Sequence, residues 1–225
     1  MARRMAAKLM AGVIWLANGA GAEICDGMDA MTDQAGMREA LPAARYTRVA
    51  AVLHWVMAVL IVGNVVLAWV AESLPENWVR PGIDLHKSVG LTVLGLVLLR
   101  VLWRVAHPPP ALPSDYPGWQ KRASHAAHMV LYGLMVVLPV SGWLHDSAFK
   151  YADKHPLMLY WVVPWFRIGA VQAMEPAAKE EFHSALYTVH AVSAYILYGL
   201  LALHILGALK HQWDGARELQ RMRVG

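Results

Sequence analysis

Residues 182–209 read FHSALYTVHAVSAYILYGLLALHILGAL, a stretch that contains histidine but no lysine, arginine or acidic residue. A helix of this length rises about 42 Å, which exceeds the ~30 Å hydrocarbon core of a bilayer. His190 and His204 are fourteen residues apart within the stretch. At about 100° and 1.5 Å per residue, they share one helix face and lie about 21 Å apart. The stretch predicts a membrane-spanning helix with a histidine near each end.

Three other apolar segments are long enough to cross a membrane, at residues 49–71, 86–105 and 125–144. Each should be helical, because hydrocarbon offers backbone amides no partner outside the segment. Of the connections, only the loop at 146–181 is long enough to form a small cap outside the membrane. The prediction is an all-α membrane protein, with a four-transmembrane-helix bundle at residues 45–213 and a tail at 214–225.

The composition of the 225-residue chain supports this class of fold. Charged residues make up 16% of the chain, against about 25% in typical soluble proteins. The single cysteine, Cys25, excludes an internal disulfide, a thiolate-ligated iron–sulfur cluster and the paired-cysteine attachment of a c-type haem. The net charge of +4 is spread over short segments beside the apolar runs, which favours a membrane surface over nucleic acid.

Basic residues beside the spans predict the orientation, because lysine and arginine resist transfer across the membrane. They precede the first span, occupy the second connection and follow the last span: Arg38, Arg45, Arg48, Arg100, Arg104, Lys121, Arg122, Lys210, Arg217, Arg221 and Arg223. The first connection, 72–84, has one arginine against three acidic residues, and the third, 146–181, has four basic residues against five acidic ones. Both termini, including the tail, are therefore expected in the cytoplasm.

Residues 1–44 are expected to form a leader outside the fold. Arg3, Arg4 and Lys8 precede an apolar segment at 9–17 and four small residues at 19–22, which is the layout of a secretory signal. Alternatively, translation starts at Met31 or Met37.

Four histidines lie at matched depths in the predicted spans. His54 and His204 are each six residues inside the basic residue that marks the cytoplasmic boundary of their helix. His86 and His190 are eighteen and twenty residues from that boundary, so both lie near the outer surface. A histidine inside a membrane is costly and is a candidate for function. The depths predict two pairs, His54 with His204 and His86 with His190.

Two facing imidazole pairs in a helical bundle suit two planar macrocycles, each with iron held axially from both sides. Zinc or copper would normally need three or four converging ligands, often with carboxylates or thiolates, and the spans supply none of these. Two haem b groups are therefore expected, and filled axial positions would let iron pass electrons without binding oxygen. Small residues near the ligands either admit a flat ring or serve helix packing; they are Gly90, Gly95, Gly199 and Gly207.

Several motifs together resemble the bacterial cytochrome b561 family: RYTR at 45–48, LHW at 53–55, LHKSVG at 85–90, LPVSG at 138–142 and LH at 203–204. The resemblance extends over about residues 45–213. It implies four helices with two b haems, and it places the ligands on His54, His86, His190 and His204. The sequence also looks like the superoxide oxidase branch of the family. This resemblance implies a location in the bacterial inner membrane, with superoxide giving up an electron at the outer, periplasmic face and ubiquinone reduced near the inner haem.

Three further residues at the inner end are candidates for the site. Arg100 and Arg104 are one turn apart and could pair with haem propionates, or form a basic collar against anionic headgroups. His211 is seven residues beyond His204 on the same helix face, and it could deliver a proton to reduced quinone. The resemblance supports this quinone-side role; without it, His211 would be an ordinary interfacial residue.

Other polar residues are ambiguous. His125 and His128 have no expected partner at their depth. Lys87, beside His86, could attract a propionate or an anionic donor, or simply extend to the interface. His183 could touch the donor, although a solvated histidine at a helix start is the plainer interpretation.

Three classes of function fit the sequence. The first is an oxidoreductase that moves electrons from superoxide, or another periplasmic donor, to a quinone. The second is an electron-conduit subunit of a hydrogenase or dehydrogenase complex, with a redox partner subunit. The third is a small transporter whose histidines line a pathway, although the spans lack the carboxylates expected for ion coupling.

Overall fold

The computed structural model of the chain describes residues 45–71, 73–110, 116–214 and 218–224. The predicted leader at 1–44 lies outside these residues. Four long helices dominate the described part: α2 (Arg48–Ala71), α3 (Glu76–Ala106), α4 (Gly118–Ser147) and α6 (Pro176–Trp213). Each is long and apolar enough to cross a bilayer. The predicted four-helix membrane fold is confirmed, and the chain is a multi-pass membrane protein.

The helices extend beyond the predicted apolar spans at several ends. α3 begins ten residues before His86 and contains Pro81 in its second turn, where proline cannot donate the backbone hydrogen bond that another residue would make to the carbonyl of Asn77. α6 begins six residues before the predicted span. Its N-cap, Glu175, accepts hydrogen bonds from the backbone amides of Ala177 and Ala178, which satisfies two donors that a helix start leaves unpaired. The extended ends carry polar residues out of the membrane.

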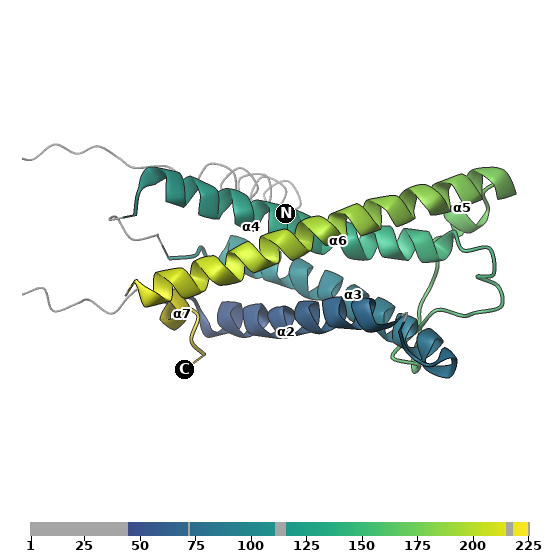
Figure 1. The fold of residues 1–225 in the computed structure, drawn as a ribbon, viewed down its shortest axis with the longest axis horizontal. Coiled ribbons are helices and arrows are strands. Elements are labelled where there is room, and N and C mark those ends of the chain that lie inside the picture. The colour runs from purple at the N-terminus through teal and green to yellow at the C-terminus, as the bar shows by residue number, and fades with distance from the viewer. Residues whose placement is uncertain (1–44, 72, 111–115, 215–217, 225) are drawn as a thin grey trace, which may run out of the picture.

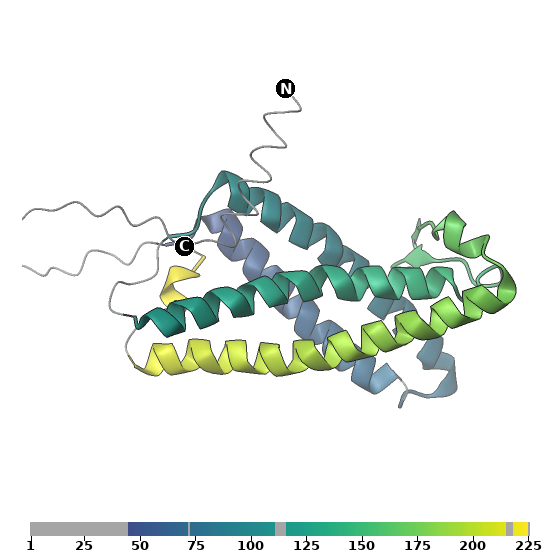
Figure 2. The ribbon, with the colours of Figure 1, turned by 90° about the horizontal axis from the view of Figure 1, so that it is seen from above.

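The bundle consists of two helix pairs, α2 with α3 and α4 with α6 (Figures 1 and 2). They join mainly where α3 packs on α4, around an apolar cluster of Met57, Val93 and Val97. α6 does not pack closely along α2 or α3, and only 6% of its most apolar segment is buried by the protein. The fold therefore leaves space between α6 and the α2–α3 pair, and turns much apolar surface towards lipid.

The third connection forms a small structured cap at one end of the bundle, as predicted for this loop. Strands β1 (Met158–Leu159) and β2 (Val163–Pro164) pair antiparallel, and helix α5 (Gly169–Gln172) follows them. Arg167 fixes the segment by donating to the backbone carbonyls of Ala152 and His155 at 2.7 Å each.

At the opposite end, the short helix α7 (Glu218–Arg221) folds back towards the start of α2 (Figure 1). The amide of Tyr46 donates to the carbonyl of Arg221, and the indole of Trp55 donates to the carbonyl of Met222. Arg221 is buried and donates to the carbonyl of Pro110. The tail residues 218–224 thus contact the bundle at the end opposite the cap.

Candidate functional site

The structure brings four histidines together in the two pairs expected from depth. The rings of His54 on α2 and His204 on α6 have centroids 6.2 Å apart and planes at 73°. The rings of His86 on α3 and His190 on α6 also have centroids 6.2 Å apart, with planes at 74°. In each pair, the histidine on α6 faces its partner on α2 or α3 across the space that separates these helices.

The ring separation fits one metal ion held between the two imidazoles of a pair. A metal–imidazole nitrogen bond is about 2 Å long, so two such bonds plus the distance from each nitrogen to its ring centre give about 6 Å. The angles of 73° and 74° between the ring planes exclude a parallel stack of the two imidazoles. No group of three or more histidine, cysteine or acidic side chains that could hold a metal ion occurs among the described residues. The donor set therefore fits an axially ligated haem iron in each pair.

Backbone carbonyls orient the outer pair, His86 and His190. The Nδ1 atom of His86 is 3.3 Å from the carbonyl oxygen of Asn64. The Nδ1 atom of His190 is 3.0 Å from the carbonyl oxygen of Leu138 and 3.1 Å from the hydroxyl of Ser141. A carbonyl only accepts, so each Nδ1 carries the proton and leaves Nε2 free to bind metal. No pattern along the chain predicts these acceptors.

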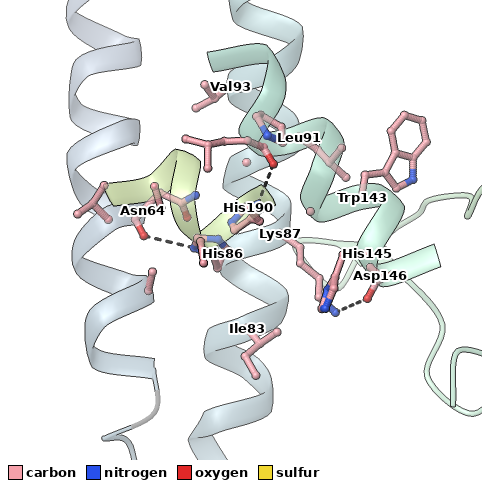
Figure 3. A pocket seen from close by; sticks show the side chains of 18 of the residues that line it. Asn64, Ile83, His86, Lys87, Leu91, Val93, Trp143, His145, Asp146 and His190 are labelled. Atoms are coloured by element: carbon pink, nitrogen blue, oxygen red, sulfur yellow. Dashed lines mark hydrogen bonds and ion pairs between the residues drawn. The ribbon is translucent and has the colours of Figure 1, made fainter. Parts of the chain in front are cut away.

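A cavity of about 640 Å³ adjoins the outer pair. This volume is within the range of small-molecule and cofactor sites. Its lining includes His86, His190, Asn64 and Gly142, contributed by all four long helices (Figure 3). A Cβ atom on Gly142 would lie 3.3 Å from the His190 ring, so the absence of a side chain at this position leaves room for the ring. The side-chain oxygen of Asn64 is buried and has no partner among the described residues.

Asp146 organises the charged residues at the outer end of this cavity. Its carboxylate is 6% exposed and lies 2.6 Å from the amine of Lys87 and 2.8 Å from Nε of Arg167. Lys87 also approaches Asp84 at 3.5 Å. Figure 3 shows the Lys87–Asp146 pair beside His145. Lys87 is thus held by carboxylates, and does not extend freely to the interface.

His183 is packed against a neighbouring histidine at the outer end. Its ring stacks on that of His145 with centroids 3.8 Å apart, and its Nδ1 lies 3.1 Å from the His145 carbonyl oxygen. His145 lines the outer cavity. The interpretation of His183 as a simple solvated histidine is therefore incomplete. Residue spacing along one helix could predict neither this stacking nor the ion pairs of Asp146 with Lys87 and Arg167.

The inner pair has different surroundings. Neither His54 nor His204 has a hydrogen-bond partner among the described residues, but aromatic rings lie close to both. Trp55 lies 5.5 Å from His54, and His128 lies 5.4 Å from His204, both edge to face. His128 was expected to have no partner at its depth; the structure instead places its ring edge to face with that of His204, and its Nδ1 lies 2.6 Å from the Ser124 carbonyl oxygen.

Arg100 is buried beside the inner pair. Its Nε donates to the hydroxyl of Tyr132 and its Nη1 to the carbonyl of Ala50, both at 2.9 Å. No carboxylate pairs with it in the part of the chain that the structure describes. Arg104 lies over the ring of Tyr132 at 5.8 Å, and its buried Nε has no partner among the described residues. Both arginines therefore project inward, where a basic collar would project outward.

His211 lies at the inner end of α6, where its ring stacks on Tyr116 at 5.1 Å. The next residue, Gln212, has a buried side-chain oxygen without a hydrogen-bond partner among the described residues. The Nε2 atom of His125 is likewise buried and without a partner among these residues.

The four glycines singled out in the sequence differ from Gly142, because a Cβ atom added to them would meet little. On Gly95, Gly199 or Gly207 it would meet nothing within 4 Å, and on Gly90 only the side-chain amide of Asn64 at 3.9 Å.

Comparisons with known proteins point to one family. The family model described as "Prokaryotic cytochrome b561" matches residues 45–225. "Cytochrome b561 homolog 2" of Escherichia coli (strain K12) is 33% identical over 181 residues, which are 79% of this chain and 90% of that protein. "Probable superoxide oxidase CybB" of Yersinia pestis is 27% identical over 72% of this chain and 85% of its own length. "Cytochrome b561 homolog 1" of Escherichia coli (strain K12) is 23% identical over 75% of this chain and 90% of its own length.

Proposed function

The chain belongs to the prokaryotic cytochrome b561 family, and from this premise we propose that it carries electrons across the membrane through two b-type haems to a quinone. The family implies b-type haem binding and electron transport. The observation that carries the proposal is the pair of equal ring separations, 6.2 Å for His54–His204 and 6.2 Å for His86–His190. Haem iron supplies one-electron chemistry between its ferric and ferrous states.

The protein's own residues would hold and separate the two centres. His86 and His190 would bind the outer haem through Nε2, because carbonyls occupy their Nδ1 atoms. His54 and His204 would bind the inner haem. Fourteen residues of α6 separate His190 from His204, so the two positions that would hold haem lie about 21 Å apart along the helix. Arg100 and Arg104 would face the propionates of the inner haem.

Superoxide is the proposed donor at the periplasmic face and ubiquinone the proposed acceptor at the cytoplasmic face. Each superoxide would lose one electron and leave as dioxygen, so two superoxide ions and two protons would convert one quinone to a quinol. His211, whose ring stacks on Tyr116 at the end of α6, would supply a proton on the inner side. The donor rests on the family resemblance and on the relative named as a probable superoxide oxidase. The positive charges near the outer cavity give little further support for an anionic donor, because Asp146 pairs with both Lys87 and Arg167.

The orientation that this requires places both termini in the cytoplasm. The His86–His190 pair and the 146–181 connection then face the periplasm, and His211 faces the cytoplasm. The distribution of lysine and arginine supports this arrangement.

The test uses purified, haem-loaded protein with an enzymatic superoxide source and a soluble ubiquinone analogue. We expect superoxide loss that depends on both quinone and protein, with two superoxide ions consumed per quinol. In His54→Ala, superoxide should still reduce the remaining haem while quinol formation stops. If dithionite reduces both haems but superoxide reduces neither, superoxide is not the donor. That result would favour the electron-conduit alternative, which predicts co-purification of a redox partner subunit.

A further inference from the structure

The β1–β2 hairpin reaches alongside the membrane-spanning part of α3. The amide of Tyr160, in the hairpin turn, donates to the hydroxyl of Ser88 at 2.9 Å. The hydroxyls of Tyr160 and Thr92 share a hydrogen bond of 2.7 Å. Both α3 residues lie in the stretch 88–99, which contains no charged residue. Thr92 is five residues beyond Lys87, or about 7.5 Å deeper along the helix axis. The turn backbone therefore lies beside Ser88, at the start of the predicted span 86–105, and the Tyr160 side chain extends deeper along α3.

The side chains around this turn are apolar and exposed. Their exposed fractions exceed half: Trp161 54%, Val162 76%, Val163 51% and Phe166 62%. On α3, Leu99 is seven residues beyond Thr92, so it points in nearly the same direction, and it is 56% exposed. Because α3 spans the membrane, Leu99 faces lipid. Leu99 thus provides a lipid-facing position on the same side of α3 as the hairpin contact at Thr92.

The hairpin backbone is suited to a non-aqueous environment, where unpaired amides are costly. The amide of Val162 donates to the carbonyl of Leu159 at 3.0 Å, and that of Trp165 to the carbonyl of Leu157 at 2.9 Å. Leu159 also pairs with Val163 across the two strands. Pro164 has no N–H to satisfy. These backbone groups need no water.

The residue types at the turn also differ from those of a turn in water. Tyr160 and Trp161 have φ values of 50° and 61°, a conformation for which hairpins strongly prefer asparagine, aspartate or glycine. Two aromatic residues there cost backbone strain, which persists only where surrounding contacts determine the conformation. The two hydrogen bonds from Tyr160 to α3 supply such contacts, and apolar surroundings would favour the aromatic side chains.

We propose that the hairpin, residues 158–164 with Phe166, is embedded in the outer leaflet of the membrane, and that lipid acyl chains contact its exposed side chains. The earlier part of the same connection, with exposed Asp153, Lys154 and His155, stays in water. Arg167 directly follows the embedded segment and binds Asp146, which holds Lys87 at the outer cavity. The lipid-embedded hairpin thus fixes the depth of the loop that closes the outer end of the site.

The first test measures the surroundings of three labelled positions in reconstituted liposomes. Nitroxide labels are attached to Val162→Cys, to Asp153→Cys as the aqueous control and to Leu99→Cys as the lipid reference, each with Cys25→Ser. Collision with dissolved oxygen and with a water-soluble nickel chelate is then compared. We expect the oxygen-to-nickel ratio at 162 to exceed that at 153 several-fold and to approach that at 99. An equal ratio at 153 and 162 would overturn the proposal.

A label at 162 that is shielded from both oxygen and nickel in native membranes would mean that protein covers the hairpin, and this would also overturn the proposal. Haem content of each variant confirms that it folds. A second measurement needs no label: quenching of tryptophan fluorescence by lipids brominated on the acyl chain is compared for the wild type and Trp161→Phe. The quenched fraction should fall in Trp161→Phe. An unchanged quenched fraction would show that acyl chains do not reach Trp161.

Discussion

The outer and inner histidine pairs have the same ring separation, but the protein holds them in different ways. At the outer pair, His86 and His190 bind carbonyl oxygens through Nδ1, and a cavity of about 640 Å³ adjoins them. At the inner pair, His54 and His204 have no hydrogen-bond partner among the described residues and lie against other aromatic rings. One site is oriented by hydrogen bonds, and the other by packing.

The two sites also differ in charge. The cations at the outer cavity, Lys87 and Arg167, share the carboxylate of Asp146. At the inner site Arg100 is buried, and no carboxylate pairs with it among the described residues. A buried positive charge favours the reduced state of a nearby iron. One bundle can thus give two histidine pairs of equal ring separation unequal surroundings. Under the proposed function, this difference in charge would favour electron movement from the outer pair to the inner one.

The largest effect is expected from replacing the ligands. His86→Ala or His190→Ala should remove one haem and leave the other, and His54→Ala or His204→Ala should do the reverse. Each loss follows because one imidazole cannot complete a two-ligand site. Haem-to-protein ratios and reduced-minus-oxidised spectra measure this, with two spectral classes among the four variants. If all four variants keep both haems, the pairing is wrong.

A bulky side chain at Gly142 should damage the outer site alone. The Cβ atom would lie 3.3 Å from the ring of His190, and the methyl groups of Gly142→Val would displace that ring from its hydrogen bonds. We expect outer haem content well below one per protein. Gly133→Val is the matched control on the same helix, because a Cβ there meets nothing within 4 Å. Equal haem loss in both variants would mean that the helix, and not the His190 position, was disturbed.

Removing the buried charge at the inner site should narrow the difference between the two haem potentials. Arg100→Gln is expected to lower the inner potential by about 60 mV for each 1.4 kcal/mol of charge interaction lost, which is the one-electron conversion. Arg100→Lys, which keeps the charge, should restore most of this shift. Lys210→Gln, an exposed cation paired with Asp214, serves as the screened control. Spectroelectrochemical titration resolves the two potentials, and a shift confined to the outer haem would contradict the assignment.

The smallest effect is expected from Ser141→Ala. His190 would lose its contact with the Ser141 hydroxyl but keep the Leu138 carbonyl as its acceptor. A neutral hydrogen bond contributes about 0.5–1.5 kcal/mol, so the outer potential should shift by a few tens of millivolts at most. In Thr188→Ala, two residues from His190, the lost hydroxyl bonds only its own helix. A shift as large in Thr188→Ala would assign the effect to helix packing.

Much of the fold was predictable because a bilayer fixes both the length and the conformation of a span. The four apolar segments all lie within observed helices. The histidine pairs were also predictable, since depth along a helix follows from counting residues. The surroundings of His128 could not be predicted, because the side chains that meet between α4 and α6 depend on how each helix is rotated about its own axis. Depth alone left His128 without a partner, whereas its ring lies 5.4 Å from His204.

The amino-acid order by itself determined which segments cross the membrane, on which side the basic residues gather and at what levels the four histidines lie. These properties depend on composition and on rise per residue, which are local. Only the tertiary structure decided that the carbonyls of Asn64 and Leu138 orient the imidazoles of the outer pair. It also decided that Asp146 pairs with two cations and that the β1–β2 hairpin contacts α3. Each of these joins residues at least 20 positions apart, and their meeting depends on how the helices pack.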